Sequence, residues 1–429
     1  MFKVLVLAYY FPPMGLSGVQ RTLKFTKYMK QFNWEPTVIT CGNTGYFAHD
    51  YSLLKEAEDA GIRIIRTESF DPNSLLKKYG TITMPREIVR KTLSKISKTV
   101  LIPDNKISWA NKAYKKAKEL LQTEKYDAIF TTIPPYSSFV SAAKLKQEFG
   151  IPLFVDYRDL WYGNHFAFYP TPYHRVKHKK LEANSLRLCD KTIVVNRKIK
   201  EKLLEYYPFL KHDDVVIISH GYDSADFENL VKLPKTNKKM QLTYSGIFYE
   251  MITPKYFLKA FKEITKERPD IAANIELNFI GHFRKENHKL VKKLGLQQFV
   301  KDHGYMDHKE MLRRLVMSDV LWMMIGKSKN TDTVTAGKLF EYFGTRKPII
   351  VSVPEGASKF NANEYGASFI TEPDNITEIK EAIIKVHTLY KAGELPKPNE
   401  EFIESLDRKN LTERLTTEFQ FFIKEEVLI

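Results

Sequence analysis

The sequence has 429 residues, of which 43% are apolar and 28% are charged, and it contains only two cysteines. This length exceeds one ordinary domain of about 150 residues, so we expect two or three globular domains, and the apolar content excludes a disordered chain. Cys41 and Cys189 are isolated in the sequence, which excludes a disulfide framework and fits a reducing cytoplasm. Because no run of about 20 apolar residues occurs, we expect no membrane-spanning segment.

The positive charge lies almost wholly in the first half of the chain. The net charge is +16, and residues 1–220 hold 35 basic against 21 acidic residues, a net +14, which leaves +2 for residues 221–429. A basic half beside a near-neutral half predicts an anionic partner for the first half. The candidates are an anionic lipid surface, a phosphate-bearing acceptor and nucleic acid, and the alternative is a basic surface without a specific partner.

Short β-branched and aromatic runs alternate with helical periodicity along the first half. Several of the runs are continuously apolar, which is typical of strands covered on both faces. This alternation predicts a parallel sheet between two layers of helices. The predicted strands are 2–8, 37–40, 63–66, 128–132, 153–156, 192–196 and 215–219, and the predicted helices are 19–30, 88–100, 109–122, 138–149, 173–188 and 198–206.

The same pattern starts again after Gly221, and the polar stretch 230–239 is the predicted linker. We therefore predict an α/β protein of two Rossmann-like domains that face each other across a cleft, with their junction within 220–240. The predicted strands are 242–245, 275–280, 300–304, 320–325, 348–353 and 368–371, and the predicted helices are 254–266, 287–294, 309–317, 338–344, 376–390 and a last one at 411–427.

A glycine-containing turn follows the first predicted strand, and a helix follows the turn. In open parallel sheets ligands bind beyond the carboxyl ends of strands, where glycines let backbone amides approach a phosphate at a helix N-terminus. Gly15, Ser17 and Gly18 are therefore candidates for phosphate contact. The spacing is not that of a dinucleotide-binding fingerprint, so a plain turn is the alternative.

A polar and aromatic cluster, Asp156-Tyr157-Arg158-Asp159-Leu160-Trp161, ends the strand that begins at Leu153. Arg158 is able to hold a phosphate or carboxylate with two hydrogen bonds, and Asp159 to orient a hydroxyl. We predict that Asp156, Arg158, Asp159 and Trp161 line the acceptor side of the site. The alternative is a buried structural pair of arginine and aspartate.

A third candidate segment, Thr333-Val334-Thr335-Ala336-Gly337-Lys338-Leu339-Phe340-Glu341-Tyr342, follows the strand that ends near Ile325. With Thr335 as N-cap, Gly337 and Lys338 fall in the first turn of a helix, where amide groups and the helix dipole favour anions. Glu341 lies three residues after Lys338, on the same side of the helix. A nucleoside diphosphate with its ribose fits this set, and a solvated ion pair is the alternative.

Four segments, in this order, resemble glycosyltransferase family four, whose members have the GT-B fold. They are K-V-L-V-L-A-Y-Y-F-P-P-M-G-L-S-G-V-Q-R-T, D-Y-R-D-L-W, H-G-Y-D-S-A-D-F and G-K-L-F-E-Y. Each segment alone is only a modest match, but the four occur in the order typical of the family and together span nearly the whole chain. The resemblance implies an acceptor-binding domain at 1–225, a donor-binding domain at 226–410 and a last helix, 411–429, that packs back on the first domain.

The resemblance also implies the chemistry. It implies transfer with retention from a UDP- or GDP-sugar to a glycan or lipid-linked acceptor, without an obligatory metal, and no D-x-D motif occurs. By position, Gly337 and Lys338 meet the diphosphate and Glu341 the ribose. The segment Gly304-Tyr305-Met306 lines the base, and Gly15 to Gly18 closes on the phosphates.

Three positions depart from the pattern of that family. Thr333 stands eight residues before Glu341, where the family has a glutamate. No arginine follows Ser245-Gly246, and Lys255 is the nearest cation. The segment 131–135, Thr-Thr-Ile-Pro-Pro, replaces a histidine. Arg158, Lys327 and Lys338 are the candidates for supplying the missing charge.

The departing nucleoside diphosphate gains negative charge, so amides and cations placed at its phosphates contribute much of the catalysis, and positioning of the acceptor contributes the rest. Arg158, Asp159, Lys338 and Glu341 are the catalytic candidates. A leaving phosphate oxygen is able to take the acceptor proton, so no protein base is required. An epimerase of the same fold and a non-enzymatic nucleic-acid-binding protein are the alternatives. The sequence shows no reading helix or stacking sheet of the kind that nucleic-acid-binding proteins use, so nucleic acid is not an expected partner.

Residues 86–101 have the pattern of an amphipathic helix. Such a helix lies in an anionic lipid interface or, alternatively, packs its apolar side on the sheet. We expect a cytoplasmic enzyme of polysaccharide biosynthesis that docks peripherally on the inner membrane face. The apolar side would hold Ile88, Val89, Leu93, Ile96 and Val100, and the basic residues are Arg86, Arg90, Lys91, Lys95 and Lys98.

Overall fold

The computed structural model describes residues 1–429 except 43, 47, 70–86, 229, 231–237 and 428–429. The chain forms two compact units, the first made of residues 1–220 with 408–429 and the second of residues 221–407. The chain therefore returns to the first unit for its last helix. Arg86 and most of the predicted linker 230–239 lie outside the described residues.

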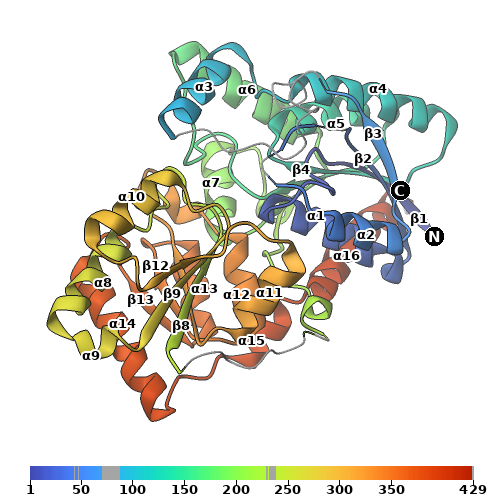
Figure 1. The fold of residues 1–429 in the computed structure, drawn as a ribbon. Helices are drawn as coiled ribbons and strands as arrows, with labels where there is room; N and C mark the ends of the chain where they lie inside the picture. Colours follow the sequence, from blue (N-terminus) through green and yellow to red (C-terminus); the bar gives the residue numbers. More distant parts are fainter. Residues whose placement is uncertain (43, 47, 70–86, 229, 231–237, 428–429) are drawn as a thin grey trace. The chain divides into compact units, whose positions relative to one another are not determined.

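A seven-stranded sheet in the order β3-β2-β1-β4-β5-β6-β7 forms the centre of the first unit (Figure 1). Every neighbouring pair is parallel. The strand order reverses between β1 and β4, which makes this the point where the following loops turn to opposite faces. The strands are β1 (Phe2–Leu7), β2 (Trp34–Cys41), β3 (Arg63–Thr67), β4 (Ala128–Ile133), β5 (Leu153–Tyr157), β6 (Lys191–Val194) and β7 (Val215–Ile217).

Helices cover both faces of this sheet because alternate side chains of each strand point in opposite directions. Phe130 of β4 packs on Phe419 of the last helix, with ring centroids 5.6 Å apart, whereas the next residue, Thr131, donates to Ser138 on the other face at 3.2 Å. Figure 1 shows α1 beside α16. The helices are α1 (Ser17–Met29), α2 (Tyr51–Asp59), α3 (Glu87–Val100), α4 (Ile107–Thr123), α5 (Tyr136–Phe149), α6 (Pro172–Leu188), α7 (Arg197–Tyr206) and α16 (Arg408–Val427).

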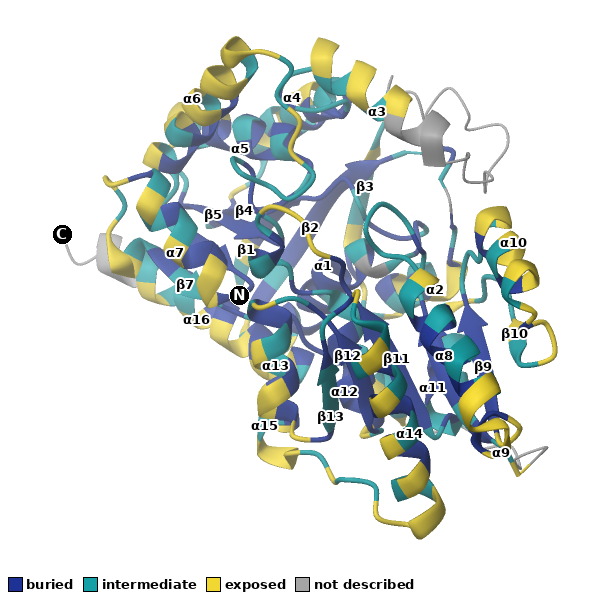
Figure 2. Cartoon of the chain, turned by 90° about the vertical axis from the view of Figure 1, so that its left-hand side faces the viewer, coloured by how far each residue is buried: buried dark blue, intermediate teal, exposed yellow. Residues whose placement is uncertain are grey.

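The second unit repeats this plan with a six-stranded parallel sheet in the order β10-β9-β8-β11-β12-β13. Its strand β11 has the sequence V-L-W-M-M and is buried throughout (Figure 2). Trp322 and Met324 belong to one hydrophobic core, and Leu321 and Met323 to the other. The strands are β8 (Met240–Ser245), β9 (Ile275–Ile280), β10 (Val300–Asp302), β11 (Val320–Met324), β12 (Ile349–Ser352) and β13 (Ser368–Thr371).

The helices of the second unit divide between these two cores. One core takes side chains from α8 (Lys255–Glu267), α9 (Pro269–Ala272), α10 (Lys285–Leu294) and α14 (Ile376–Ala392). The other takes them from α11 (His308–Met317), α12 (Gly337–Thr345), α13 (Ala357–Tyr365) and α15 (Glu400–Ser405). Each face of the sheet is thus sealed by its own helical layer.

The predicted α/β architecture of two Rossmann-like parallel sheets is confirmed. Four short helices, α2, α9, α13 and α15, were not predicted, because segments of nine residues or fewer give little periodic signal. None of the helices in the described part of the chain is long and apolar enough to cross a lipid bilayer.

Candidate active site

The candidate residues lie at the carboxyl ends of the two sheets, near the points where the strand order reverses. In the first unit, Gly15 and Gly18 follow β1, and Arg158 follows β5. In the second unit, Gly246 follows β8, and Lys338 lies in the helix after β11. Open parallel sheets bind ligands at these reversal points, between β1 and β4 and between β8 and β11.

The N-terminus of α12 lacks a capping side chain. The N-cap residue is Ala336, with φ −70° and ψ 122°, and its methyl side chain makes no capping hydrogen bond. Thr335 was predicted to be the N-cap, and this prediction was wrong because the helix begins one residue later, at Gly337. Amide groups at an uncapped N-terminus are suited to an anionic ligand.

Lys338 extends from the first turn of α12 to the end of β8. Its Nζ donates to the hydroxyl of Tyr244 at 2.7 Å and lies 4.0 Å from the centroid of that ring. Burial lowers the pKa of Lys338 to about 7, and the charge of Glu341 opposes this shift. A Cβ on Gly246 would stand 2.7 Å from this Nζ, so the glycine leaves room for the amine. Lys338 is therefore poised to change its charge near neutral pH.

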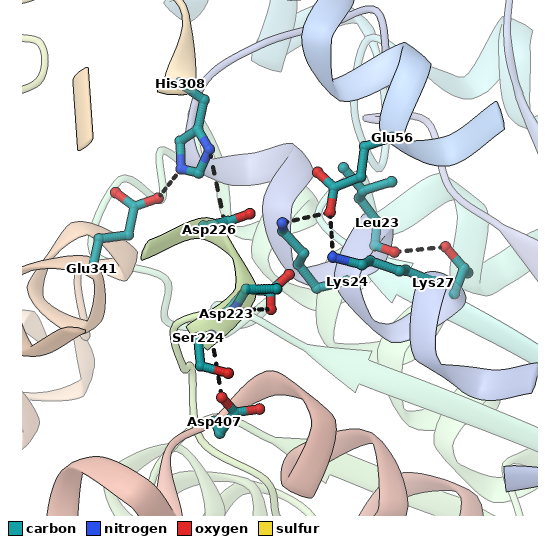
Figure 3. Close-up of polar contacts among 12 residues, drawn as sticks. Leu23, Lys24, Lys27, Glu56, Asp223, Ser224, Asp226, His308, Glu341 and Asp407 are labelled. Atoms are coloured by element: carbon teal, nitrogen blue, oxygen red, sulfur yellow. Dashed lines mark hydrogen bonds and ion pairs between the residues drawn. The ribbon is translucent and has the colours of Figure 1, made fainter. Parts of the chain in front are cut away.

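Glu341, one turn after Lys338, is held by a histidine that the sequence analysis did not single out. His308 Nε2 lies 2.9 Å from Glu341 Oε1, and His308 Nδ1 lies 3.9 Å from Asp226 Oδ2 (Figure 3). Asp226 belongs to the H-G-Y-D-S-A-D-F segment, in the short helical turn Ser224–Phe227. The solvated Lys338–Glu341 pair considered as an alternative is not the main contact of either residue, since each has another partner.

Three glycines bring the carboxyl ends of neighbouring strands into close backbone contact. Gly246 N donates to Ile280 O at 2.8 Å, and Gly281 N donates to Gly304 O at 2.8 Å. A Cβ on Gly281 would meet the carbonyl oxygen of Gly246 at 2.5 Å. Beside them Tyr305 stacks on His282, with centroids 5.5 Å apart and planes at 12°. Met306 follows, partly buried. The segment predicted to line a base thus presents a flat aromatic pair.

Lys327, a candidate for the missing phosphate-binding charge, and Lys255, the nearest cation after Gly246, have other surroundings. Lys327 Nζ forms ion pairs with Glu372 and Asp374, both at 2.8 Å, which raise its pKa. Lys255 is the exposed first residue of α8, and its Nζ lies 5.2 Å from the ring centroid of Tyr256. Lys338, by contrast, contacts Tyr244 at the end of β8.

In the first unit, Asp156 is fully buried and bonds to Arg21. The Arg21 Nε lies 2.9 and 3.0 Å from the two carboxylate oxygens, and Nη2 lies 2.7 Å from Oδ1. Thr132 also donates to Asp156 Oδ2, at 3.2 Å. The prediction that Asp156 lines an acceptor wall was therefore wrong, because its carboxylate neutralises a buried arginine.

Arg158 binds backbone rather than a carboxylate. Its guanidinium donates to the carbonyl oxygens of Gly18, Ile133 and Pro134, and it lies 5.7 Å from the ring centroid of Tyr10. These contacts join the ends of β4 and β5 to the first turn of α1. Gly18 is adapted to this contact, since a Cβ there would stand 3.3 Å from Arg158 Nη1. Gly15 is buried in the preceding loop, and the side chain of Ser17 lies outside the described part.

Trp161 supports the loop after β5 from inside the fold. It is 1% exposed, stacks on Tyr136 with centroids 5.1 Å apart, and donates from Nε1 to His178 Nδ1 at 3.0 Å. Burial lowers the pKa of His178 to about 4, so its ring is neutral and accepts. Trp161 therefore does not line an acceptor wall as predicted, and Asp159, which is partly exposed, is the remaining carboxylate of the cluster.

His220, at the end of β7, is a further buried group in this unit. Its pKa is lowered well below 6.5 by burial and then by the charges of Arg21, Arg408 and Arg158. The H-G-Y-D segment marks it in the sequence, but the surrounding arginines are distant in the chain. Three arginines thus lie near a neutral histidine at the end of this sheet.

Two family models match the chain in succession. The model described as Glycosyltransferase Family 4 matches residues 16–226, and the model described as Glycosyl transferases group 1 matches residues 226–403. The chain belongs to glycosyltransferase family 4. It is an enzyme that transfers sugars, and its two parallel-sheet units are those of the GT-B fold.

Solved structures with the same fold match over nearly the whole chain. A sucrose-phosphate synthase from Thermosynechococcus elongatus has a TM-score of 0.66 at 14% identity, with 99% of this chain and 100% of that chain covered. A trehalose-6-phosphate protein of E. coli bound with UDP-2-fluoroglucose has a TM-score of 0.62 at 11% identity, with 97% and 98% covered. The UDP-GlcNAc 2-epimerase of Methanocaldococcus jannaschii has a TM-score of 0.57 at 11% identity, with 98% and 100% covered. No curated protein gives a significant match.

Proposed function

We propose that this family 4 glycosyltransferase takes its sugar from a nucleoside diphosphate sugar bound at the carboxyl end of the second sheet. The observation that carries the proposal is the convergence of three features at α12: an uncapped N-terminus, the Lys338 amine, and the Glu341 carboxylate. Amides and an ammonium group attract a diphosphate, and a carboxylate accepts from ribose hydroxyls. His308 engages Glu341 Oε1, so the ribose would meet Oε2.

Leaving-group stabilisation would come from the same groups. As the bond to the anomeric carbon breaks, negative charge grows on the β-phosphate, and donors fixed in advance around it lower the barrier. The α12 amides and Lys338 are such donors, and Gly246, which has no side chain, leaves room for the Lys338 amine. With the leaving phosphate oxygen accepting the proton of the acceptor hydroxyl, the sugar would be transferred with retention. The anomer of the product, read by NMR, tests this.

Uridine is the favoured base. The E. coli protein of the same fold holds UDP-2-fluoroglucose, and an S. aureus protein of this fold was solved with UDP. In this chain the Tyr305–His282 pair offers a flat surface on which a base would stack. Thermal-shift titrations with UDP-, GDP- and ADP-sugars would rank the donors, since a ligand that binds only the folded state raises its stability.

The acceptor would be an anionic glycan or lipid-linked glycan held by the basic first unit, in cytoplasmic polysaccharide biosynthesis at the inner membrane face. The net charge of +14 on residues 1–220 supports an anionic partner. Arg158 and Asp159 are the residues we propose to meet it. Arg158 has three neutral carbonyl partners, so its charge is not cancelled by them.

Replacing Glu341 with glutamine is expected to weaken UDP binding about 10- to 100-fold, because a hydrogen bond to a charged group contributes about 1.5–3 kcal/mol. Isothermal titration calorimetry measures the change. Glu400→Gln is the matched control, since Glu400 lies in the same unit and pairs with Arg346 at the surface. Equal UDP affinity for Glu341→Gln and the control, with both proteins folded, would remove Glu341 from the donor site.

A further inference from the structure

Large apolar side chains are concentrated on one exposed surface of the first unit. Among the described residues, eleven large hydrophobic side chains are exposed, and six of them lie on α3, on α6 or in the loop before α6. Figure 2 shows the exposed stretches of both helices in yellow. Extensive exposed apolar surface on a folded unit marks an interaction site. The six residues are Leu93, Ile96, Val100, Phe168, Tyr173 and Val176, with exposed fractions from 37% for Phe168 to 72% for Val100.

These residues belong to one continuous surface because contacts join α3 to α6 and its preceding loop. His174 Nε2 lies 3.0 Å from the carbonyl oxygen of Thr99. Lys98 Nζ donates to the carbonyl oxygen of Phe166 at 2.7 Å. The apolar side chains of the two helices therefore sit on a shared support. We call these six residues, together with the basic residues described below, the α3–α6 surface.

The apolar side of α3 is turned away from the sheet. Leu93, Ile96 and Val100 recur at helical spacing, and in an ordinary surface helix this stripe would be buried in the core. In the structure all three are more than half exposed. The alternative in which this stripe packs on the sheet is therefore wrong for the described side chains. Those of Ile88, Val89, Arg90 and Lys91 lie outside the described part of the helix.

The surface is also basic. Within the described side chains of α3 and α6 the sole carboxylate is Glu182, which is buried and accepts from Tyr157 and Tyr207. Lys95 lies 5.6 Å from the ring centroid of Phe168, so cations and apolar groups are interleaved. The exposed basic residues of these two helices are Lys95, Arg175, Lys177, Lys179, Lys180 and Arg187.

We propose that the α3–α6 surface docks the enzyme on an anionic lipid bilayer. Apolar side chains flanked by lysine and arginine match both parts of such a bilayer, since the apolar groups enter the acyl boundary and the cations meet the head groups. An apolar protein partner would not require the uniform positive charge, and a nucleic acid would not require the aliphatic side chains. The proposal deepens the proposed function, because the bilayer would supply the lipid-linked acceptor.

Vesicle sedimentation with the full chain tests the proposal. The protein is expected to bind vesicles of phosphatidylglycerol and phosphatidylcholine at low salt and to bind pure phosphatidylcholine weakly. Salt at 0.5 M is expected to release it, because the electrostatic screening length is then only about 4 Å. Ile96→Ser/Val176→Ser removes apolar contacts. Lys177→Gln/Lys180→Gln removes charge and is expected to lower the vesicle partition coefficient about 25-fold, since each basic residue contributes about fivefold.

Matched controls come from the second unit. Phe360→Ser changes a side chain that is 63% exposed on α13, and Lys292→Gln/Lys293→Gln changes two exposed lysines of α10. Both controls are expected to bind vesicles like the parent chain. Absence of binding to anionic vesicles at low salt, or unchanged binding of both α3–α6 variants, would overturn the proposal. Self-association lost in these variants without vesicle binding would also overturn it and assign the surface to a second copy.

UDP titration of the same proteins separates this proposal from the proposed function. Intact UDP binding without vesicle binding would overturn the docking surface alone. Vesicle binding without binding of any nucleotide would overturn the donor site and leave the docking surface standing.

Discussion

Alanine in place of Asp156 is expected to destabilise the first unit by about 3–5 kcal/mol, because it leaves a buried charge without its partner. Arg21 is 1% exposed and makes three hydrogen-bond contacts with the Asp156 carboxylate. Its remaining donors reach the carbonyl oxygens of Ile218 and Ser219 at 2.8 and 2.6 Å. The charge of Arg158, which like that of Arg21 lowers the pKa of His220, adds electrostatic repulsion with Arg21 once the Asp156 carboxylate is gone.

Urea unfolding followed by tryptophan fluorescence measures this loss, because three of the four tryptophans, Trp34, Trp109 and Trp161, lie in the first unit. Glu124→Ala is the matched control. It breaks an ion pair of the same unit, at 2.6 Å from Arg63, but Arg63 is 51% exposed, so the expected loss is below about 1 kcal/mol. An Asp156→Ala variant no less stable than this control would contradict the structural role of the pair.

The sequence was sufficient to predict the two sheets because parallel strands buried on both faces leave a local signature. The run V-L-W-M-M of β11 has no polar residue, and it feeds two cores at once. The predicted strand at 153–156 corresponds to β5, which extends by one residue to Tyr157. Helix starts were less certain, as Thr335 shows, since the N-cap depends on a shift of a single residue.

The partners of the site residues were not predictable from local pattern. Asp156 was expected to face an acceptor, but its carboxylate is bound by Arg21, which lies 135 positions away in the chain. His308 is 33 positions from Glu341, and no spacing rule connects them. A polar residue at the end of a strand is equally able to serve a ligand or a buried charge, and tertiary contacts decide which. Arg158 donates to three backbone carbonyl oxygens from two separate segments, and no pattern of side chains in the sequence would reveal these contacts.

Lys338 is different, because its local position and its tertiary surroundings agree. The sequence placed it in the first turn of a helix after a strand, and α12 begins at Gly337. The structure adds the hydroxyl of Tyr244 and the room that Gly246 leaves for the amine. With a pKa of about 7, the free enzyme holds this amine in both charge states near neutral pH. A diphosphate favours the ammonium form, so binding would raise its pKa.

Binding of UDP at pH 8 is therefore expected to take up close to one proton per nucleotide, and binding at pH 6 almost none from this residue. Below pH 7 the amine is already charged before UDP binds, whereas above pH 7 a proton must be recruited, so affinity falls by up to about tenfold per pH unit. Calorimetry in buffers of different ionisation enthalpy measures the proton count. At pH 8 the phosphates of UDP, whose pKa is about 6, are already deprotonated before binding, so they do not add to the proton uptake.

Lys338→Met is expected to lose this uptake and to weaken UDP binding about 10- to 100-fold at pH 6, where the parent amine is charged. Above pH 7 the difference narrows, because the parent then binds with the added requirement for a proton. Lys327→Met is the matched control, since its amine is paired with Glu372 and Asp374 and its pKa is raised, so it stays charged throughout. Proton uptake that persists in Lys338→Met, or vanishes in the Lys327 control, would assign the titrating group elsewhere. If the UDP affinity of the parent chain did not change with pH, the diphosphate would not bind beside this amine.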